Sequence, residues 1–360
     1  MAGGYATRLR PMSYALPKLL FPVAGRPILE QTIEHLSSFG VDEVILAVNY
    51  MADQLRQHFG DEYGGVRIRY SLESQPLGTG GPIALARHYY DKNEPFVAMN
   101  GDILSDIDLH QMKKLHESND VLVTIALHEV DDPTRFGVVR LDERSRIRDF
   151  VEKPSLADAP SKLVNAGVYL IEPQTVDRIP VGRKVIIERE VFPILAAEGE
   201  LCGYVHPGTW FDIGNMSDFR NANFALLESK TRGGLLVGDA ARISSSATLA
   251  EPIVVSDGAI IEDGARLGPR TIVGRRVRIC TDASVRTSVV FDDVHIGSDC
   301  SVEGAILGNC VTIGNGVVIE EGSVVAGYTK IRDNIRIARN VCVHPYKEID
   351  EDILTSGHVV

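Results

Sequence analysis

Apolar residues follow two different spacings along the chain, and the change comes near residue 230. Before it, short apolar runs alternate with longer segments in which apolar residues recur every three or four positions, which predicts strands alternating with helices. Strands are expected at residues 44–48, 66–70, 96–99 and 121–127, and helices at residues 27–39, 50–59, 79–90 and 108–117. Closely spaced strands follow between residues 136 and 171, and two more helices are expected around residues 186–198 and 215–228. This order favours an α/β fold with a mainly parallel, mixed sheet.

From residue 243 onward the helical spacing disappears and apolar residues recur at every sixth position. Consecutive apolar positions run in this way from Ile243 to Phe291, and the spacing resumes at Leu307 after one change of phase. Two positions before most of them stands a second column of small or β-branched residues, such as Ala259 and Val277. This period predicts a β-solenoid in which each side is one short strand and three sides make one coil. A β-sandwich is the alternative, but its apolar residues would alternate with a period of two.

The two patterns divide the chain into four parts. We expect an α/β domain at residues 1–228, a linker at 229–242, a solenoid at 243–345 and a C-terminal tail at 346–360. A length of 360 residues is enough for two domains of ordinary size.

Charge and cysteine content exclude several classes of protein. The net charge of −12 gives no long-range attraction to nucleic acid or to an anionic membrane, so any phosphate site must be built locally. The five cysteines are far apart and form no C-x-x-C pair, which argues against a disulfide framework or a zinc ribbon. No apolar run is long enough to span a bilayer, and no signal peptide is evident. We therefore expect a soluble, cytoplasmic protein without nucleic-acid or membrane partners.

The chain begins with a loop suited to binding a polyphosphate. Residues 3–11 contain two adjacent glycines, a threonine and two arginines, and Lys18 follows shortly after. Glycines let backbone N–H groups approach phosphate oxygens, while arginine and lysine supply charge. The loop is not a Walker A motif, because no G-x-x-x-x-G-K-[ST] occurs. A flexible surface loop with exposed cations is the alternative.

Together these residues resemble the signature of the sugar-nucleotide pyrophosphorylases, G-G-x-G-T-R-L-x-P followed by P-K. Further motifs stand in the family's order at residues 76–82, 100–102, 136–138, 151–154, 165–167 and 210–214. The similarity covers about residues 1–228, and the P-L-G-T-x-G-P and E-x-E-V-F-P stretches look closest to the GDP-mannose pyrophosphorylases. The resemblance implies a Rossmann-like nucleotidyltransferase domain followed by a left-handed parallel β-helix of hexapeptide repeats.

The resemblance also implies the roles of particular residues. Arg8 and Lys18 match the positions that hold the triphosphate and stabilise the transition state. Nucleotide-binding positions are Gly3, Gly4, Thr7, Gln75, Gly78 and Thr79, and sugar-phosphate-binding positions are Gly137, Glu152, Lys153 and Asn165. The alternative for Glu152 and Lys153 is an exposed salt bridge. Adjacent residues of a strand face opposite ways, so the two side chains need not both enter the binding pocket.

A magnesium site is expected at two aspartates. Asp102 follows the apolar strand expected at residues 96–99, where the carboxyl end of a parallel strand presents ligands, and Asp212 follows a similar short apolar stretch. Hard carboxylate oxygens are the ligands that Mg²⁺ prefers. A turn or helix-cap role is the alternative for each aspartate taken alone.

Two departures from the family pattern affect the loop. Ala6 replaces the family's third loop glycine and adds a methyl group where backbone freedom is usual. In the family an apolar strand of about five residues precedes the two glycines, whereas here only Met1 and Ala2 do. We therefore expect that the chain as written begins too late, or is truncated, and that a neighbouring strand lacks a ladder partner.

The expected reaction is transfer of a nucleotidyl group, with GTP and mannose 1-phosphate as the best candidates for substrates. A glucose-1-phosphate thymidylyl- or uridylyltransferase shares nearly all the motifs, and a non-catalytic regulatory relative that binds sugar nucleotide is a further alternative. A solenoid acyltransferase would need a catalytic histidine, and we interpret His295, which lies within the repeat, as an exposed turn residue without an obvious partner. The β-helix is expected to be structural and to mediate homo-oligomerisation, because an open end of a coil must be covered.

Overall fold

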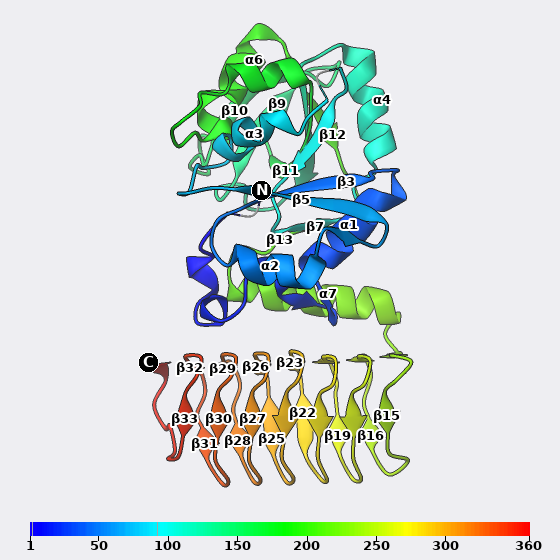
Figure 1. The fold of residues 1–360 in the computed structure, drawn as a ribbon, viewed down its shortest axis with the longest axis vertical. Helices are drawn as coiled ribbons and strands as arrows, with labels where there is room; N and C mark the ends of the chain where they lie inside the picture. The colour runs from blue at the N-terminus through cyan, green and yellow to red at the C-terminus, as the bar shows by residue number, and fades with distance from the viewer. Residues whose placement is uncertain (2, 92) are drawn as a thin grey trace. The chain divides into compact units, whose positions relative to one another are not determined.

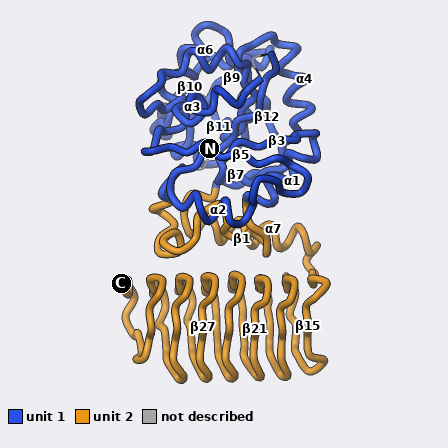
Figure 2. The backbone as a smooth tube through the Cα atoms, in the orientation of Figure 1, with its two compact units in different colours: residues 1–5, 29–212 blue, residues 6–28, 213–360 orange. Residues whose placement is uncertain are grey.

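The computed structural model describes residue 1 and residues 3–91 and 93–360, and it contains two compact units (Figure 2). Unit 1 comprises Met1–Tyr5 and Leu29–Asp212, and unit 2 comprises Ala6–Ile28 and Ile213–Val360. The loop that carries Arg8 and Lys18 therefore groups with the C-terminal part of the chain. No contiguous division of the sequence at residue 228 produces this arrangement.

Unit 1 is built around a six-stranded sheet (Figure 1). Its strands lie in the order β10-β9-β11-β8-β12, and β6 pairs with β11. The bounds are β6 Phe96–Met99, β8 Val123–Glu129, β9 Gly137–Leu141, β10 Ile147–Glu152, β11 Leu163–Ile171 and β12 Leu201–Val205. Only β8 and β12 run parallel in this sheet, because β11 lies antiparallel to β6, β8 and β9. The sheet is mixed, as expected, but the expectation of mainly parallel pairing was wrong, because the hairpin of β9 and β10 reverses the chain before β11 enters the sheet.

Helices cover both faces of this sheet, as the alternation along β11 shows. Val168 and Leu170 pack in one core cluster with Leu36 and Met112, whereas Tyr169 packs on the other face with Phe192. The helices on the first face are α1 (Ile28–Ser38) and α4 (Leu109–Asn119), and those on the second are α3 (Gly81–Leu85), α5 (Ile187–Glu190) and α6 (Phe192–Glu198). These elements agree closely with those expected from the apolar spacing.

Two smaller sheets complete unit 1. In the first, β3 (Glu43–Val48) and β5 (Val66–Leu72) are parallel and β4 (Glu62–Tyr63) is antiparallel, with α2 (Ala52–Phe59) joining β3 to β4. In the second, β7 (Ile103–Ser105) pairs with β13 (Trp210–Asp212).

The strand β6 has a ladder partner, β11, along one side only among the described residues. Near its end, the amino terminus of Met1 donates to Met99 O at 2.7 Å, and Gly101 N donates to Met1 O at 2.9 Å. Burial lowers the pKa of this amino group. Ala2, the other residue that precedes the glycines, lies outside the described residues.

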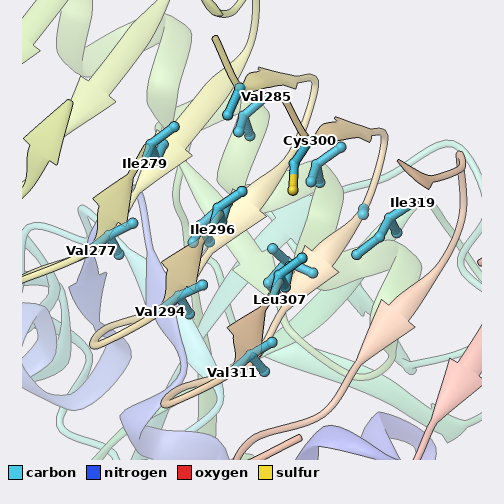
Figure 3. Close-up of a cluster of buried hydrophobic side chains, with 14 of the residues drawn as sticks. Val277, Ile279, Val285, Val294, Ile296, Cys300, Leu307, Val311 and Ile319 are labelled. Carbon is cyan, nitrogen blue, oxygen red and sulfur yellow. The ribbon is translucent and has the colours of Figure 1, made fainter. Parts of the chain in front are cut away.

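Unit 2 contains a parallel β-solenoid of three sheets. Its strands run from β14 (Leu235–Val237) through β33 (Glu348–Ile349) to β34 (Gly357–Val359), so the ladder extends beyond residues 243–345. Interior aliphatic residues stack in columns from one coil to the next (Figure 3). The small corner position is filled by Ala283 in one coil and Cys300 in the next, and the Cys300 thiol donates to Gly314 O at 2.9 Å.

Two sides of the solenoid are one residue shorter than the rest. Residues that pair between successive coils are one whole coil apart in sequence. Leu235 and Ile253 are 18 residues apart, whereas Val273 and Val290 (290 − 273 = 17) and Val290 and Leu307 (307 − 290 = 17) are 17 apart, so one side of each of these two coils lacks a residue. The interior residue is therefore Val290, and the expectation that Phe291 points inward was wrong. The change of phase comes earlier than expected, and the side chain of Phe291 leaves the interior column because β-strand residues alternate between faces.

Phe291 packs instead against the N-terminal loop and the last helix. Its ring centroid lies 5.7 Å from that of Phe21 and 5.8 Å from that of Phe219 on α7 (Met216–Thr231). The Ala24 N–H donates to Asn223 Oδ1 at 3.0 Å, also on α7. The loop of residues 6–28 is therefore fixed to the solenoid within unit 2.

Across all the residues described, no helix is both long enough and apolar enough to cross a membrane.

Candidate functional site

Three of the sequence motifs meet at the centre of β11 in unit 1. Asn100 N donates to Gly167 O at 2.8 Å, and the Trp210 indole N–H donates to Ala166 O at 2.9 Å. Asn165 Oδ1 accepts from Gly167 N at 2.9 Å, which fixes the orientation of its amide. A Cβ atom on Gly167 would lie only 2.7 Å from Asn100 Nδ2, so this approach requires glycine. Motifs more than a hundred residues apart in the chain thus form one cluster.

The two aspartates predicted to bind a metal lie at the same end of one strand pair. Asp212 of β13 is opposite Ile103 of β7, directly beside Asp102. Within the described part of the chain, no group of three or more His, Cys, Asp or Glu side chains gathers as a complete metal site. Two carboxylates fit a hard cation that takes its remaining ligands from phosphate oxygens and water, which is the usual behaviour of Mg²⁺.

Glu152 and Gly137 are register partners at the open end of the β9–β10 hairpin. A Cβ atom on Gly137 would lie 3.0 Å from Glu152 Oε2 and 2.7 Å from the Phe150 ring, so glycine makes room for the carboxylate. Lys153 has a left-handed backbone, with φ 53°, which breaks the usual alternation of side chains. Its Nζ lies 3.7 Å from Glu152 Oε1, so the two charged groups are neighbours despite being adjacent in sequence.

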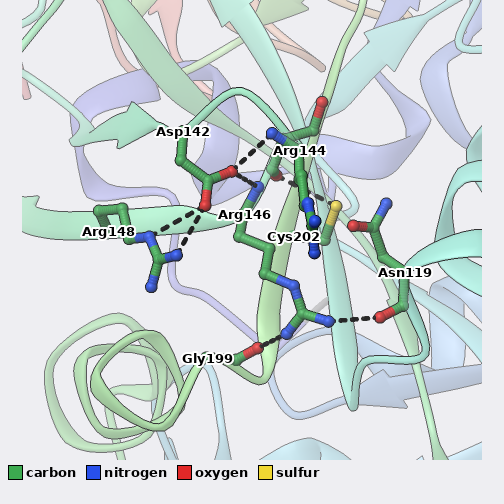
Figure 4. A network of polar contacts seen from close by, with 8 residues as sticks. Asn119, Asp142, Arg144, Arg146, Arg148, Gly199 and Cys202 are labelled. Carbon is green, nitrogen blue, oxygen red and sulfur yellow. Dashed lines mark hydrogen bonds and ion pairs between the residues drawn. The ribbon is translucent and has the colours of Figure 1, made fainter.

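The opposite end of this hairpin is held by a network of polar contacts (Figure 4). Asp142 Oδ1 accepts from the backbone N–H groups of Arg144 and Arg146 at 2.8 and 2.9 Å, and these bonds lower the pKa of Asp142. The Arg146 guanidinium donates to the backbone oxygens of Asn119, at 2.6 Å, and Gly199. The hairpin that carries Gly137 and Glu152 is thereby tied to the end of α4 and to the segment before β12.

The loop predicted to contact the base is held against residues 185–188. Gly78 forms a bridge with Val185, and a Cβ atom on Gly78 would lie 2.3 Å from Val185 O. The Thr79 hydroxyl donates to Glu188 Oε2. Gln75, also predicted to contact the nucleotide, is exposed.

Two buried carboxylates near this loop were missed by the sequence reasoning. Glu73 is 6% exposed, its Oε2 accepts from Leu77 N at 2.9 Å, and its Oε1 has no hydrogen-bond partner among the described residues. Glu188 is 7% exposed, and burial raises its pKa. A signal for Glu73 was present, since a carboxylate directly after a predicted strand deserved the same interpretation as Asp102.

Glu73 lies next to the two glycines of the phosphate loop. A Cβ atom on Gly3 would lie 2.5 Å from Glu73 Oε1, so a larger residue there would require the Glu73 side chain to shift, whereas a Cβ atom on Gly4 would meet nothing within 4 Å. Burial also raises the pKa of Glu73. Glu73 Oε1, a buried side-chain oxygen without a hydrogen-bond partner among the described residues, therefore lies against the start of the predicted phosphate loop.

The remaining predicted residues, Thr7, Arg8 and Lys18, belong to unit 2. Thr7 and Arg8 are exposed in the short 3-10 helix Thr7–Leu9, and Lys18 begins the 3-10 helix Lys18–Leu20. A Cβ atom on Gly214 would lie 3.6 Å from both Nη atoms of Arg8, so the guanidinium lies over this glycine of the 210–214 motif. Ala6, which precedes them, has φ 46° and ψ 42°.

Comparison with known proteins assigns both parts of the chain to described families. The family model described as "Nucleotidyl transferase" matches residues 1–229, and that described as "GMPPB C-terminal domain" matches residues 236–359. A protein of Oryza sativa subsp. japonica named "Probable mannose-1-phosphate guanylyltransferase 3" is 33% identical over 354 residues, which cover 93% of this chain and 97% of that protein. The "Mannose-1-phosphate guanylyltransferase" of Mycobacterium tuberculosis is 38% identical over 306 residues, covering 84% of this chain and 82% of that protein.

Solved structures match somewhat less than two thirds of the chain. HddC from Yersinia pseudotuberculosis is 28% identical with a TM-score of 0.53, covering 62% of this chain and 96% of its own. An apo UDP-glucose pyrophosphorylase, at 23% identity and a TM-score of 0.57, covers 64% of this chain and 97% of its own and shows the shared fold.

Proposed function

Because this chain belongs to the nucleotidyl transferase family and carries a GMPPB C-terminal domain, we propose that it transfers the guanylyl group of GTP to mannose 1-phosphate. The products are GDP-mannose and pyrophosphate. The observation that carries this proposal is the similarity to mannose-1-phosphate guanylyltransferases over both parts of the chain. The clustering of the motifs around Asn165–Gly167 supports it independently.

In the proposed reaction a phosphate oxygen of the sugar attacks the α-phosphorus of GTP in line. A bond forms between that oxygen and phosphorus, and the bond to the bridging oxygen of pyrophosphate breaks. Catalysis then depends on positioning and on neutralising charge, without a covalent intermediate. Arg8 and Lys18 are assigned to the triphosphate, with Gly3, Gly4 and Thr7 supplying backbone and hydroxyl donors.

Asp102 and Asp212 are proposed to hold Mg²⁺, which would neutralise charge on the phosphates. The sugar and its phosphate are assigned to Gly137, Glu152, Lys153 and Asn165. Glu152 can accept hydrogen bonds from two sugar hydroxyls, and Lys153 beside it can contact the sugar phosphate. Their charged groups are 3.7 Å apart, which brings both within reach of one ligand but equally fits the alternative of a salt bridge.

A guanine base is supported by the unpartnered oxygen of Glu73. Guanine presents two adjacent N–H donors on its Watson–Crick edge, whereas uracil, thymine, adenine and cytosine present a donor next to an acceptor. A carboxylate accepts from both donors of guanine at once. Glu73 Oε1 is buried and has no hydrogen-bond partner among the described residues, which is costly, so a ligand that contacts this oxygen after a shift of the side chain gains affinity.

The base assignment is tested with a panel of GTP, ATP, UTP and dTTP against mannose 1-phosphate and glucose 1-phosphate, with release of pyrophosphate as the readout. We expect GTP and mannose 1-phosphate to be the best pair. The variant Glu73→Gln should lower kcat/KM for GTP on the order of 100-fold and reduce the preference over UTP, because an amide N–H₂ then faces the guanine donors. Equal use of UTP or dTTP by the unchanged protein would contradict the guanylyl assignment.

A homo-oligomer assembled through the solenoid and a cytoplasmic location also belong to the proposal. The first coil leaves the interior-column residues Leu235 and Val237 exposed, and β14 pairs along one side only among the strands described. All five cysteines are free thiols, which is typical of a reducing compartment. The interpretation of His295 as an exposed turn residue was wrong, because it lies half-buried in the strand β24 (His295–Ile296). Its Nε2 is 4.0 Å from Cys280 Sγ, an arrangement that gives no support to an acyltransferase.

A further inference from the structure

A continuous chain of hydrogen bonds inside unit 1 joins the predicted base loop to the predicted sugar-binding strand. Asn165 Nδ2 donates to the Tyr169 hydroxyl at 3.0 Å, and that hydroxyl donates to Glu188 Oε1 at 3.4 Å. From the other side, the Thr79 hydroxyl donates to Glu188 Oε2 and accepts from the Ile187 N–H at 3.0 Å. Every hydroxyl hydrogen in the chain is thus directed toward Glu188.

This chain is buried, so its links depend strongly on one another. Tyr169 is fully buried and Glu188 nearly so. In such surroundings a hydrogen bond is stronger than in water, and breaking one link leaves an unsatisfied polar group. The hydroxyls of Thr79 and Tyr169 therefore cannot move independently of Glu188 without a cost.

The chain sets how Asn165 faces a ligand. Its Oδ1 accepts from Gly167 N and its Nδ2 donates to Tyr169, so the amide cannot flip without losing both bonds. An amide has two donors and two acceptor lone pairs, which leaves one N–H and one lone pair for a sugar hydroxyl. Tyr169 and the Gly167 N–H therefore together orient Asn165 toward the sugar.

We propose that Glu188 and Tyr169 are positioning residues that couple the two substrates, so that nucleotide bound at Thr79 tightens the binding of sugar 1-phosphate at Asn165. This inference rests on the proposed function, since it requires nucleotide to bind at Thr79 and sugar 1-phosphate to bind at Asn165. Coupling of this kind is reciprocal, so sugar 1-phosphate must tighten nucleotide binding by the same factor. Neither residue contacts the reacting atoms in this account.

The test measures the dissociation constant of mannose 1-phosphate by calorimetry, with and without a GTP analogue that has a methylene group between its α- and β-phosphates. For the unchanged protein we expect the analogue to tighten binding about five- to tenfold. Tyr169→Phe should reduce this ratio to about one, because it removes the link while keeping the ring that packs on Phe192. Tyr90→Phe is the matched control, since its hydroxyl donates to Ile83 O outside the chain, and it should keep the full ratio.

A second variant cuts the same chain at its other end. Thr79→Val should also abolish the ratio, and the double variant Thr79→Val, Tyr169→Phe should show no further loss, because one missing link already uncouples the sites. The inference would be overturned if the analogue tightened the binding of mannose 1-phosphate as much in Tyr169→Phe as in the unchanged protein. It would also be overturned if the analogue did not tighten this binding in the unchanged protein. Failure of the unchanged protein to make product with any substrate pair would overturn the proposed function itself, which is a different outcome from product formation without coupling.

Discussion

At the scale of single residues, Ala6 has a left-handed backbone that side chains other than glycine adopt with strain. Its φ of 46° lies in the region that costs an alanine roughly 1 to 2 kcal/mol. The backbone is held there by the Ser13 hydroxyl and the Leu9 N–H, which both donate to Ala6 O. The departure from the family's glycine at this position, noted in the sequence, therefore carries a conformational cost.

The variant Ala6→Gly should raise the free energy of unfolding by about 0.5 kcal/mol, because relief of strain exceeds the added entropy of the unfolded chain. Urea denaturation measures the change. Ala15→Gly is the matched control, since Ala15 has an ordinary φ of −107°, and it should lower the same quantity by roughly 0.5 to 1 kcal/mol. If both variants are destabilised alike, the strain at Ala6 is not real.

The sequence predicted residues that lie in recognisable motifs and missed those whose importance depends on burial. Asn165 and Gly137 were predicted because they stand in motifs that resemble the family's, and Asp102 also because it follows an apolar strand. Glu73 and Glu188 were not given a role, because a carboxylate becomes significant only when tertiary packing removes it from water.

At the scale of elements, the apolar spacing located the strands and helices of unit 1 but not the direction of its strands. Spacing reports which face of an element is buried, whereas pairing direction depends on how hairpins such as β9–β10 return the chain. The six-residue period likewise predicted the solenoid but misplaced Phe291. On one of the three sides of the solenoid, strands carry two or three consecutive apolar residues, as at residues 253–255 and 289–291. Because alternate residues of a strand point to opposite faces, this pattern was a signal that the outer face of that side is also buried.

The cluster of Phe21, Phe219 and Phe291 fixes the loop that carries Arg8 and Lys18. Phe291→Ala should lower the free energy of unfolding by about 3 to 5 kcal/mol and should lower kcat/KM for GTP, because the loop loses its anchor. Val302→Ala, inside the solenoid, should reduce stability while leaving kcat/KM for GTP unchanged at temperatures where it is folded. A folded Phe291→Ala protein with unaltered kcat/KM would show that the loop is positioned by other contacts.

At the scale of the whole molecule, the chain forms two compact units rather than two contiguous segments, and no periodicity in the sequence could indicate this. The grouping of residues 6–28 with the solenoid depends on aromatic contacts between residues about 200 to 270 positions apart (219 − 21 = 198; 291 − 21 = 270). The solenoid itself was visible from sequence alone, because each coil contacts only its neighbours and repeats the same pattern.

The open first coil is predicted to be the contact between copies. Val237 is 40% exposed although its column is buried in later coils, so Val237→Lys should reduce the mass per particle in light scattering with little loss of stability. Val318→Lys is the matched control, because Val318 is 37% exposed on the outer face of β28 (Val318–Ile319) in a middle coil. An unchanged particle mass for Val237→Lys would place the contact elsewhere.

The most direct test of the account is a single-turnover measurement of transfer of the labelled α-phosphate of GTP to mannose 1-phosphate, in the unchanged protein and in Asp102→Asn. We expect labelled GDP-mannose from the unchanged protein and a rate lower by several orders of magnitude in Asp102→Asn, with the fold intact, because the lost charge acts on the transition state. Asp106→Asn is the control for the loss of a nearby carboxylate, since Asp106 pairs with His206 and has no assigned role in the reaction. No labelled product from the unchanged protein, or equal rates for Asp102→Asn and the unchanged protein, would contradict the account.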